Sequence, residues 1–269
     1  MIEFKNFSKS YGDFQAVDDI SFSVKDGEIT GFVGKNGAGK STSIRSMVDI
    51  LSPSLGSITI NGLDSVKNAK EIKLNMSYMP SEALFYKGVT CRQLFKLASK
   101  FPNTSYDQAE ELAKYFELNI DKVVSELSLG NRKKVSIILA LMKDSRAFIL
   151  DEPSNGLDPV MKEKLFLKLN ERKNNGACIF LSSHNMDEIE RFCDRVIFIK
   201  DGKITEDLDL RNVEGSKKHL VKYTDSENVH KEYTFEGDIN ELIAELSGLK
   251  IKDLEIRKPS LEEEFFKQY

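Results

Sequence analysis

Long apolar runs are missing from this chain of 269 residues. No stretch approaches the roughly 20 consecutive apolar residues that a helix needs to cross a bilayer. The N-terminal residues alternate like a strand and contain no apolar core of a signal peptide. We therefore expect a cytoplasmic protein, in which any role at a membrane comes through a partner.

Cysteine is scarce, and positive charge is not in excess. Cys91, Cys178 and Cys193 show no metal-ligand spacing, which predicts reduced, structural thiols. The net charge of −4 and the pI near 5.6 argue against a nucleic-acid-binding protein that relies on a basic face. The charge is also uneven, because residues 205–269 contain 16 acidic and 10 basic side chains, and this suggests a separate C-terminal unit.

Repeats and low-complexity tracts are absent as well, and the hydrophobic content of 40% is enough for a large core. The pairs Asp26-Gly27 and Asp201-Gly202 are typical of hairpin turns. Apolar residues at helical spacing predict helices over 41–51 and 135–142. Short apolar or alternating runs predict strands at residues 2–7, 18–24, 28–33, 75–79, 147–151, 177–182 and 195–200.

This order of elements favours an α/β fold. Strands that alternate with helices imply a mostly parallel sheet covered on both faces, and the early strands add an antiparallel edge. Residues of about 82–128 are helical and poor in strands, which predicts a helical subdomain inserted into a main domain of residues 1–204. Residues 205–269 are expected to form a small α+β appendage.

One glycine-rich segment matches the phosphate-loop pattern completely, and it stands between a predicted strand and a predicted helix. Its glycines let backbone N–H groups turn toward phosphate oxygens, at a helix N-terminus that attracts anions. Lys40 would place its charge at the β- and γ-phosphates, Ser41 would coordinate Mg²⁺, and Thr42 would bind a phosphate nearer the base. The pattern consists of Gly34, Lys35, Asn36, Gly37, Ala38, Gly39, Lys40 and Ser41.

Two adjacent carboxylates end the strand predicted at 147–151. In open α/β sheets, ligands bind at the carboxyl ends of the strands. Asp151 is thus placed to hold the Mg²⁺ shell, directly or through water, and Glu152 to polarise an attacking water. In isolation such a pair could be a solvated turn, but with the phosphate loop it indicates a catalytic pair.

A third motif, Leu127 to Asn131, lies just before the helix that carries residues 135–142. Ser128 and the N–H groups that follow it stand at that helix N-terminus, where anions bind. An N-cap serine without a ligand is the alternative.

In order and spacing, these motifs resemble the nucleotide-binding subunit of ATP-binding cassette (ABC) transporters over about residues 2–204. The resemblance implies the phosphate-loop ATPase fold, with ATP and Mg²⁺ as cofactors. It makes residues 127–131 the signature sequence, Glu152 the catalytic base and His184 the switch that contacts the γ-phosphate. Tyr11 matches the aromatic residue that stacks on adenine, with Val17 beside it.

Two motifs depart from the family's pattern. Leu129 stands where the signature has its first glycine, and Asn131 where it has glutamine, while Ser128 and Gly130 are kept. Ser81 follows Pro80 where the family usually has a glutamine that reaches Mg²⁺ and water. Serine is too short for that reach, so Glu82 or a bridging water would have to fill the place.

The resemblance also implies partners. Two cassettes, identical or paired with a second kind, would dimerise head to tail, so that Ser128, Gly130 and Asp158 contact the ATP of the partner. Separate transmembrane subunits would bind the helical subdomain on the cytoplasmic face of the membrane. Candidate contacts for those subunits, or ordinary core residues, are Leu84, Phe85 and Tyr86.

The C-terminal residues 259–266 resemble an ending common in bacterial exporters of drugs, antimicrobial peptides and lipids. We therefore expect an exporter subunit that hydrolyses ATP to drive efflux. Two alternatives remain open. One is a regulatory subunit with weak or no hydrolysis, and the other is a soluble ABC protein of translation or DNA repair. Proteins of the latter kind generally carry two cassettes, and a single one occurs here.

Overall fold

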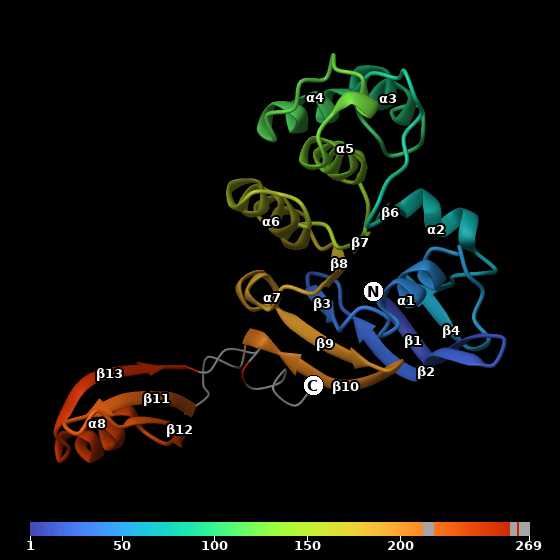
Figure 1. Ribbon diagram of the computed structural model, residues 1–269. Coiled ribbons are helices and arrows are strands. Elements are labelled where there is room, and N and C mark those ends of the chain that lie inside the picture. Colours follow the sequence, from blue (N-terminus) through green and yellow to red (C-terminus); the bar gives the residue numbers. More distant parts are fainter. Residues whose placement is uncertain (212–217, 259–262, 264–269) are drawn as a thin grey trace. The chain divides into compact units, whose positions relative to one another are not determined.

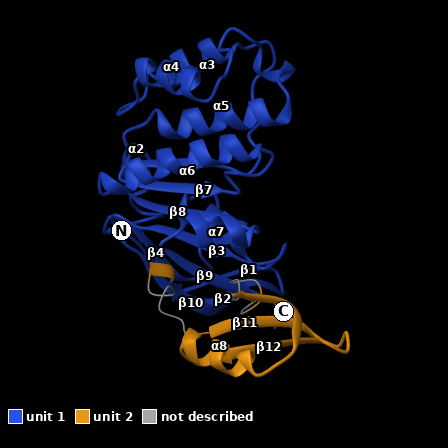
Figure 2. Cartoon of the chain, turned by 90° about the vertical axis from the view of Figure 1, so that its left-hand side faces the viewer, with its two compact units in different colours: residues 1–209 blue, residues 210–269 orange. Residues whose placement is uncertain are grey.

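The chain divides into two compact units, Met1–Asp209 and Leu210–Tyr269, shown in separate colours in Figure 2. The computed structural model describes residues 1–211, 218–258 and 263. Strand β10 (Lys203–Asp209) runs across position 204, where the sequence suggested a boundary, because it pairs antiparallel with β9 (Arg195–Lys200). The Asp201-Gly202 turn between them is a hairpin, as expected.

A six-stranded sheet forms the centre of the first unit, in the order β10-β9-β3-β8-β7-β6. All its neighbouring pairs are parallel except β10 with β9. Every residue of β3, β7 and β8 is buried, which explains their continuous apolar sequences. The remaining bounds are Ile29–Val33 for β3, Met76–Met79 for β6, Ala147–Asp151 for β7 and Cys178–Ser183 for β8.

The early strands form a second, antiparallel sheet in the order β2-β1-β4-β5. The predicted hairpin at Asp26-Gly27 is wrong, since β2 and β3 belong to different sheets. Gly27 does turn the chain, with φ of +67°, but β3 then pairs with β8 and β9 because it is apolar on both faces. The bounds are Ile2–Tyr11 for β1, Phe14–Val24 for β2, Leu55–Ile60 for β4 and Leu63–Asp64 for β5.

The main core lies between the two sheets. Phe22 of β2 stacks on Phe32 and Phe180 of the central sheet, with ring centroids 5.7 and 5.9 Å away. Helix α1 (Lys40–Met47) completes this core. On the opposite face, α6 (Pro159–Asn174) and α7 (Met186–Phe192) cover the sheet. Gly31 allows this packing, because a Cβ there would lie 2.6 Å from Ile189 of α7.

A helical layer stands beyond the β6 end of the sheet, at the top of Figure 1. It contains α3 (Cys91–Ala98), α4 (Tyr106–Tyr115) and the short 3₁₀ helix Val124–Glu126. Helix α5 (Leu129–Leu141) packs against both α3 and α4, so the layer continues beyond position 128. One further helix, α2 (Ala69–Asn75), leads into β6.

The second unit is a three-stranded antiparallel sheet, β12-β11-β13, with α8 (Ile239–Ser247) packed on one face. Its strands are β11 (Lys218–Asp225), β12 (His230–Glu236) and β13 (Ile251–Arg257). The sequence pattern at 259–266 lies outside the described residues, apart from Glu263.

Two further expectations concern the described part of the chain. All three cysteines are buried and unpaired, as predicted. Among the residues that the structure describes, no helix has both the length and the apolar composition to cross a bilayer.

Candidate active site

Three chain segments meet at one edge of the central sheet, because their strands are parallel and in register. Val33 of β3 stands opposite Ser183 of β8, and Asp151 of β7 stands opposite Ser182. The segments that leave these strand ends therefore begin side by side. They are the phosphate loop, the Asp151-Glu152 pair and the segment with His184.

The phosphate loop is held closely against its surroundings. Gly39 has φ of +109°, and a Cβ on it would lie 2.8 Å from the carbonyl oxygen of Ala16. A Cβ on Gly34 would lie 2.3 Å from the carbonyl oxygen of Ile199. Only glycine fits these two places. Val17 is fully buried beneath Gly39, so it supports the loop rather than lining a cavity.

Lys40 begins α1 with a buried ammonium that bonds to its own loop. Its Nζ donates to the carbonyl oxygens of Gly34 at 2.5 Å and Lys35 at 3.1 Å. Burial lowers the pKa of Lys40, and the carboxylates of Glu152 and Asp151 oppose that shift. When a phosphate is bound, its oxygen atoms can accept the hydrogen bonds that Lys40 Nζ donates here to the loop carbonyls.

The two carboxylates occupy different environments. Asp151 is buried and accepts a hydrogen bond from Ser182 Oγ at 2.6 Å. The same Oγ accepts from the backbone N–H of Glu152 at 3.0 Å. Glu152 has φ of +51°, a conformation that costs a non-glycine residue ~1–3 kcal/mol. This turn leaves Asp151 buried and directs Glu152 to His184, whose Nδ1 lies 2.6 Å from Glu152 Oε2.

A cavity of about 620 Å³ is lined by the phosphate loop, Glu152 and His184. Tyr11 and Phe14 stand opposite each other at the β1–β2 hairpin and form one wall. Phe14 is 65% exposed and was not singled out from the sequence, although an aromatic residue so near Tyr11 was a usable signal. The lining is Tyr11, Phe14, Ala16, Lys35, Asn36, Gly37, Gly39, Lys40, Ser41, Thr42, Ser81, Glu152, Asn155 and His184.

The three residues expected to contact a partner's ATP all lie outside this lining. Ser128 caps α5, accepting from the N–H of Asn131 at 3.4 Å. Asp158 caps α6 through the N–H of Met161 at 3.0 Å. Gly130 lies against the carbonyl of Gly156, where a Cβ would approach to 3.2 Å. The structure thus brings Gly130 against the loop after Glu152, although Gly130 itself does not line the phosphate cavity of the same chain.

Comparison with known proteins decides what this arrangement is. The family model described as "ABC transporter" matches residues 17–155. The chain belongs to the ABC transporter family. It is an ATP-binding subunit, and ATP hydrolysis is its activity.

Relatives of this ABC subunit span most of its length. It is 32% identical to the ABC transporter ATP-binding protein YtrB of Bacillus subtilis, over 91% of this chain and 80% of that protein. It is 30% identical to the bacitracin transport ATP-binding protein BcrA of Bacillus licheniformis, over 99% and 96%. A solved ATP-binding subunit of an ABC transporter superposes with a TM-score of 0.74, at 30% identity over 80% of this chain and 92% of the other.

The donor atoms of the ABC subunit fit the family's Mg²⁺-nucleotide. Ser41 and Asp151 offer hard oxygen atoms at the same sheet edge, and Mg²⁺ typically takes one or two such protein ligands together with phosphates and water. Within the described residues, no group of three His, Cys, Asp or Glu side chains could hold a metal by itself. Ser41 and Asp151 would therefore hold the ion together with phosphate oxygens and water.

The loop after β6 lines the same cavity at Ser81. The carbonyl oxygen of Ser81 accepts a hydrogen bond from Lys133 Nζ at 3.0 Å, a residue that the sequence had not indicated. Further along this loop, Leu84 is 100% exposed and Tyr86 is exposed, while Phe85 is half-buried.

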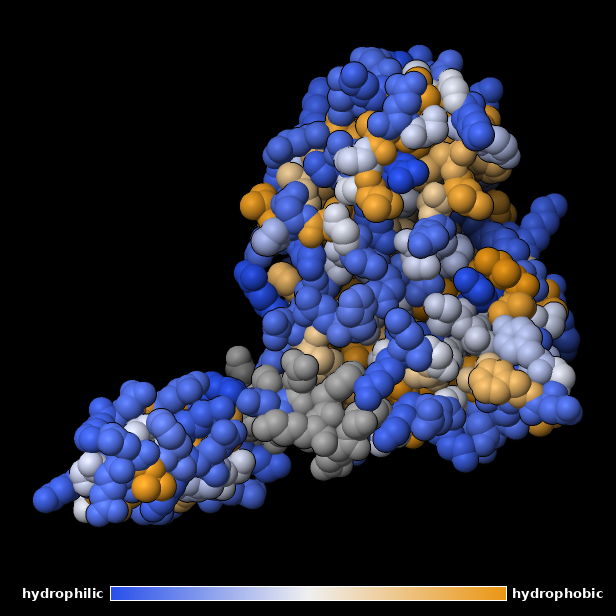
Figure 3. All heavy atoms as spheres, in the orientation of Figure 1, coloured by the Kyte–Doolittle hydropathy of each residue, from blue (hydrophilic) through white to orange (hydrophobic). Residues whose placement is uncertain are grey.

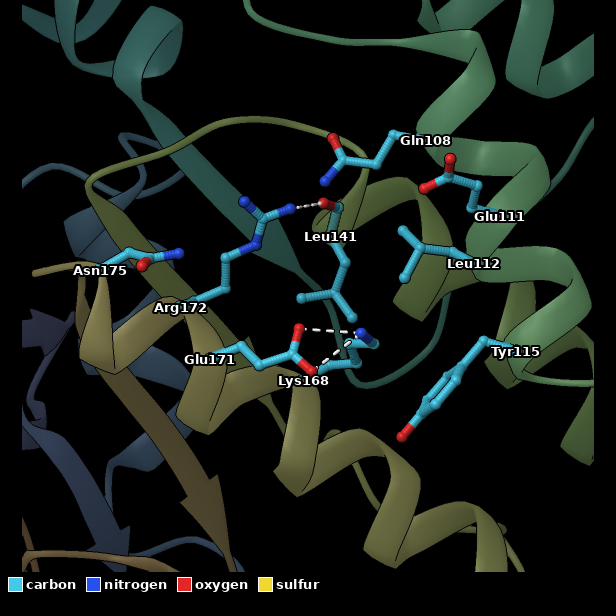
Figure 4. Close-up of a pocket in the computed structure, with 9 residues that line it drawn as sticks. All are labelled: Gln108, Glu111, Leu112, Tyr115, Leu141, Lys168, Glu171, Arg172 and Asn175. Atoms are coloured by element: carbon cyan, nitrogen blue, oxygen red, sulfur yellow. Dashed lines mark hydrogen bonds and ion pairs between the residues drawn. The ribbon is translucent and has the colours of Figure 1, made fainter.

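A separate cavity of about 360 Å³ lies between α4 and α6, and Figure 4 shows its lining. Its two basic side chains are already engaged. Lys168 Nζ bonds to Glu171 at 2.8 Å, and Arg172 donates to the carbonyl oxygen of Leu141 at 2.6 Å. Both basic groups are thus engaged within the chain, and none of the lining residues belongs to the phosphate loop.

Proposed function

We propose that this ABC subunit hydrolyses Mg-ATP at a site shared by two cassettes, and that it thereby drives export through separate membrane subunits. The observation that carries the proposal is the 2.6 Å contact between His184 and Glu152 at the wall of the phosphate cavity. A carboxylate that a histidine holds in place beside a phosphate loop is suited to orient and deprotonate an attacking water.

Each group at the sheet edge has a distinct role in this proposal. The loop N–H groups, Lys40 and Thr42 bind the phosphates, with Asn36 and Ala38 belonging to the same loop. Ser41 and Asp151 hold Mg²⁺, which neutralises phosphate charge when it is bound. Glu152 accepts the proton of water, and His184 positions Glu152 and contacts the γ-phosphate.

A second cassette completes the site. Ser128, Gly130 and Asp158 lie outside the phosphate cavity of their own chain, so they are available to a partner. The N-terminus of α5 presents N–H groups of a kind that bind anions. The dimeric bacterial ABC transporter cassette MJ0796 has the same fold, with a TM-score of 0.72 at 23% identity.

Export is favoured by the names of the relatives. Besides the bacitracin transport protein, the Nod factor export ATP-binding protein I of Burkholderia orbicola is 32% identical over 75% of this chain. By analogy the cargo would be a peptide, an antibiotic or a lipid, and the subunit would lie peripherally at the cytoplasmic face of the membrane.

The helical layer offers a surface for the membrane subunits. Its exposed apolar side chains include Leu84, Tyr86, Leu97 and Phe101. Figure 3 shows hydrophobic side chains gathered on this upper part of the molecule. Exposed apolar patches of this kind mark contact sites for proteins or membranes.

A regulatory subunit with weak hydrolysis is the second candidate, and two observations favour it. Ser81 lacks the reach of the family's glutamine, and Leu129 replaces a signature glycine. Measured ATPase activity of the chain together with its membrane subunits distinguishes the two candidates.

The central test is Glu152→Gln, which keeps the shape of the side chain but removes the base. We expect turnover to fall by about 10²–10⁴ while ATP affinity is kept, because only proton transfer is lost. The variant should also form an ATP-dependent dimer in gel filtration. Glu163→Gln is the matched control, because Glu163 of α6 forms an exposed ion pair with Arg191 of α7. Unchanged turnover, or a monomer at saturating Mg-ATP, contradicts the proposal.

A further inference from the structure

Lys133 is a buried lysine that the sequence motifs did not single out. It lies on α5, five positions after Ser128, and is only 8% exposed. Lysine is almost never fully buried unless its ammonium is paired. Such burial costs free energy, so the contacts of this ammonium need a physical explanation.

The ammonium of Lys133 ties the helical layer to the wall of the phosphate cavity. Its Nζ donates to the carbonyl oxygen of Ser81 at 3.0 Å, and Ser81 lines that cavity. The bond spans 52 positions in the sequence and joins α5 to the loop that follows β6. The two segments are therefore joined directly by this bond.

The charge of Lys133 also acts on the catalytic carboxylates. Burial lowers the pKa of Lys133, while Asp151, Glu152 and Glu82 raise it, which means that the ammonium lies in the field of these carboxylates. Lys40 is under the influence of the same Asp151 and Glu152. The carboxylate pair thus has one lysine on the phosphate-loop side and a second on the side of the helical layer.

Lys143, just beyond the same helix, shows what a purely structural lysine looks like here. Its Nζ donates to the carbonyl oxygen of Met76 at 3.0 Å, and burial lowers its pKa. No carboxylate contributes to that shift. The two lysines share the carbonyl bond and the burial, and they differ in the neighbouring carboxylates.

We propose that Lys133 is a positioning residue that links the helical layer to the catalytic carboxylates. In this chain it replaces the link that a glutamine at position 81 would make. A carbonyl oxygen at Ser81 is enough for this link, because the long side chain comes from α5 instead. The charge of Lys133 also lowers the negative potential at Asp151 and Glu152. This inference rests on the proposed function of the site.

The test compares Lys133→Met with Lys143→Met, since methionine keeps much of the length and removes the charge. We expect turnover of Lys133→Met to fall about tenfold or more, because small misplacements of catalytic groups are costly. Nucleotide binding, measured with a fluorescent ATP analogue, should need about threefold less Mg²⁺, because one positive charge beside the carboxylates is gone. Lys143→Met should change thermal stability and neither of these quantities.

Two further variants separate position from charge. Lys133→Arg keeps charge and donors, so both its Mg²⁺ dependence and its turnover should remain close to those of the unaltered chain. Ser81→Gln, added to Lys133→Met, should restore turnover to within about threefold while the altered Mg²⁺ dependence persists. If Lys133→Met does not fold, Lys133→Gln takes its place, because it removes the same charge and keeps a polar end, and the same change in Mg²⁺ dependence is expected.

The outcomes distinguish this inference from the function on which it rests. If the unaltered chain neither binds nor hydrolyses ATP, the proposed function fails. If it is active and Lys133→Met behaves like Lys143→Met, only the role of Lys133 is overturned. If Ser81→Gln does not restore turnover in the Lys133→Met variant, the claim that Lys133 replaces a glutamine at position 81 is also overturned.

Discussion

The sheet edge and the helical layer contribute to the same cavity by different means. At the edge, Asp151, Glu152 and His184 directly end or follow parallel strands whose register fixes their separation. On the helical side, Lys133 of α5 meets Ser81 of the loop after β6 only through the length of its side chain. The phosphate loop, Asp151, Glu152 and His184 match the family's pattern, whereas the departures lie in the loop after β6 and at the start of α5.

The difference teaches where such a site can vary. A shift of a central strand by one residue in its pairing register turns every side chain of that strand to the opposite face of the sheet. The residues at a strand end are therefore fixed in position, and few substitutions are expected to be tolerated there. A contact between a loop and a helix is less restricted, because either segment can supply the long side chain. Here the loop lacks a long side chain, and a lysine on α5 reaches the backbone carbonyl of the loop instead. Catalysis is thus expected to depend strongly on the edge and more gradually on the helical layer.

The largest effect in this comparison is expected for His184→Ala. Loss of the contact to Glu152 should lower turnover at least about 100-fold, because the base is no longer held toward the water. ATP affinity should change less than threefold, since the phosphate loop is untouched. Steady-state kinetics and equilibrium binding of ATP measure the two quantities.

His230→Ala is the control for this experiment. His230 lies in the second unit, bonded to Thr224 Oγ1 at 2.8 Å, and should leave turnover unchanged. An active His184→Ala variant would break the comparison, because the edge would then tolerate change as well as the helical layer does.

The sequence predicted the edge well because its signals are local. The apolar run at 147–151 coincides with β7, and the eight-residue glycine pattern sits between β3 and α1. The hairpin predicted at Asp26-Gly27 was wrong, because a two-residue turn signal does not determine with which strand the following residues pair. Lys133 could not be found, since its partner is 52 positions away and is a backbone carbonyl that any residue type would supply.

A smaller effect is expected at the cavity wall formed by Tyr11 and Phe14, where Phe14→Ala should weaken ATP binding about five- to tenfold. Base–aromatic stacking contributes ~1–3 kcal/mol per base. The Nζ of Lys9 lies 5.5 Å from the centroid of the Tyr11 ring, so part of the surface of Tyr11 is already occupied and Phe14 can share the base. Isothermal calorimetry with ATP measures the loss.

Inorganic triphosphate, which has no base, should bind Phe14→Ala as well as it binds the unaltered chain. Phe101→Ala is the matched control, because Phe101 is also 65% exposed but lies after α3 in the helical layer. Equal losses for ATP and triphosphate would mean that Phe14 shapes the phosphate loop instead of contacting the base.

The smallest effect is expected for Leu129, although it occupies a position where the family has glycine. Leu129 is the first residue of α5 and is 76% exposed, and its φ is not among the positive values of the described backbone. Its Cβ is therefore unstrained, and the glycine is not required for conformation. Leu129→Ala and Leu129→Gly should both keep ATPase activity within about threefold, with Gly slightly less stable in thermal unfolding. A loss above tenfold in both variants would show that the leucine side chain contacts the partner cassette, and the helical side would then be as strictly determined as the sheet edge.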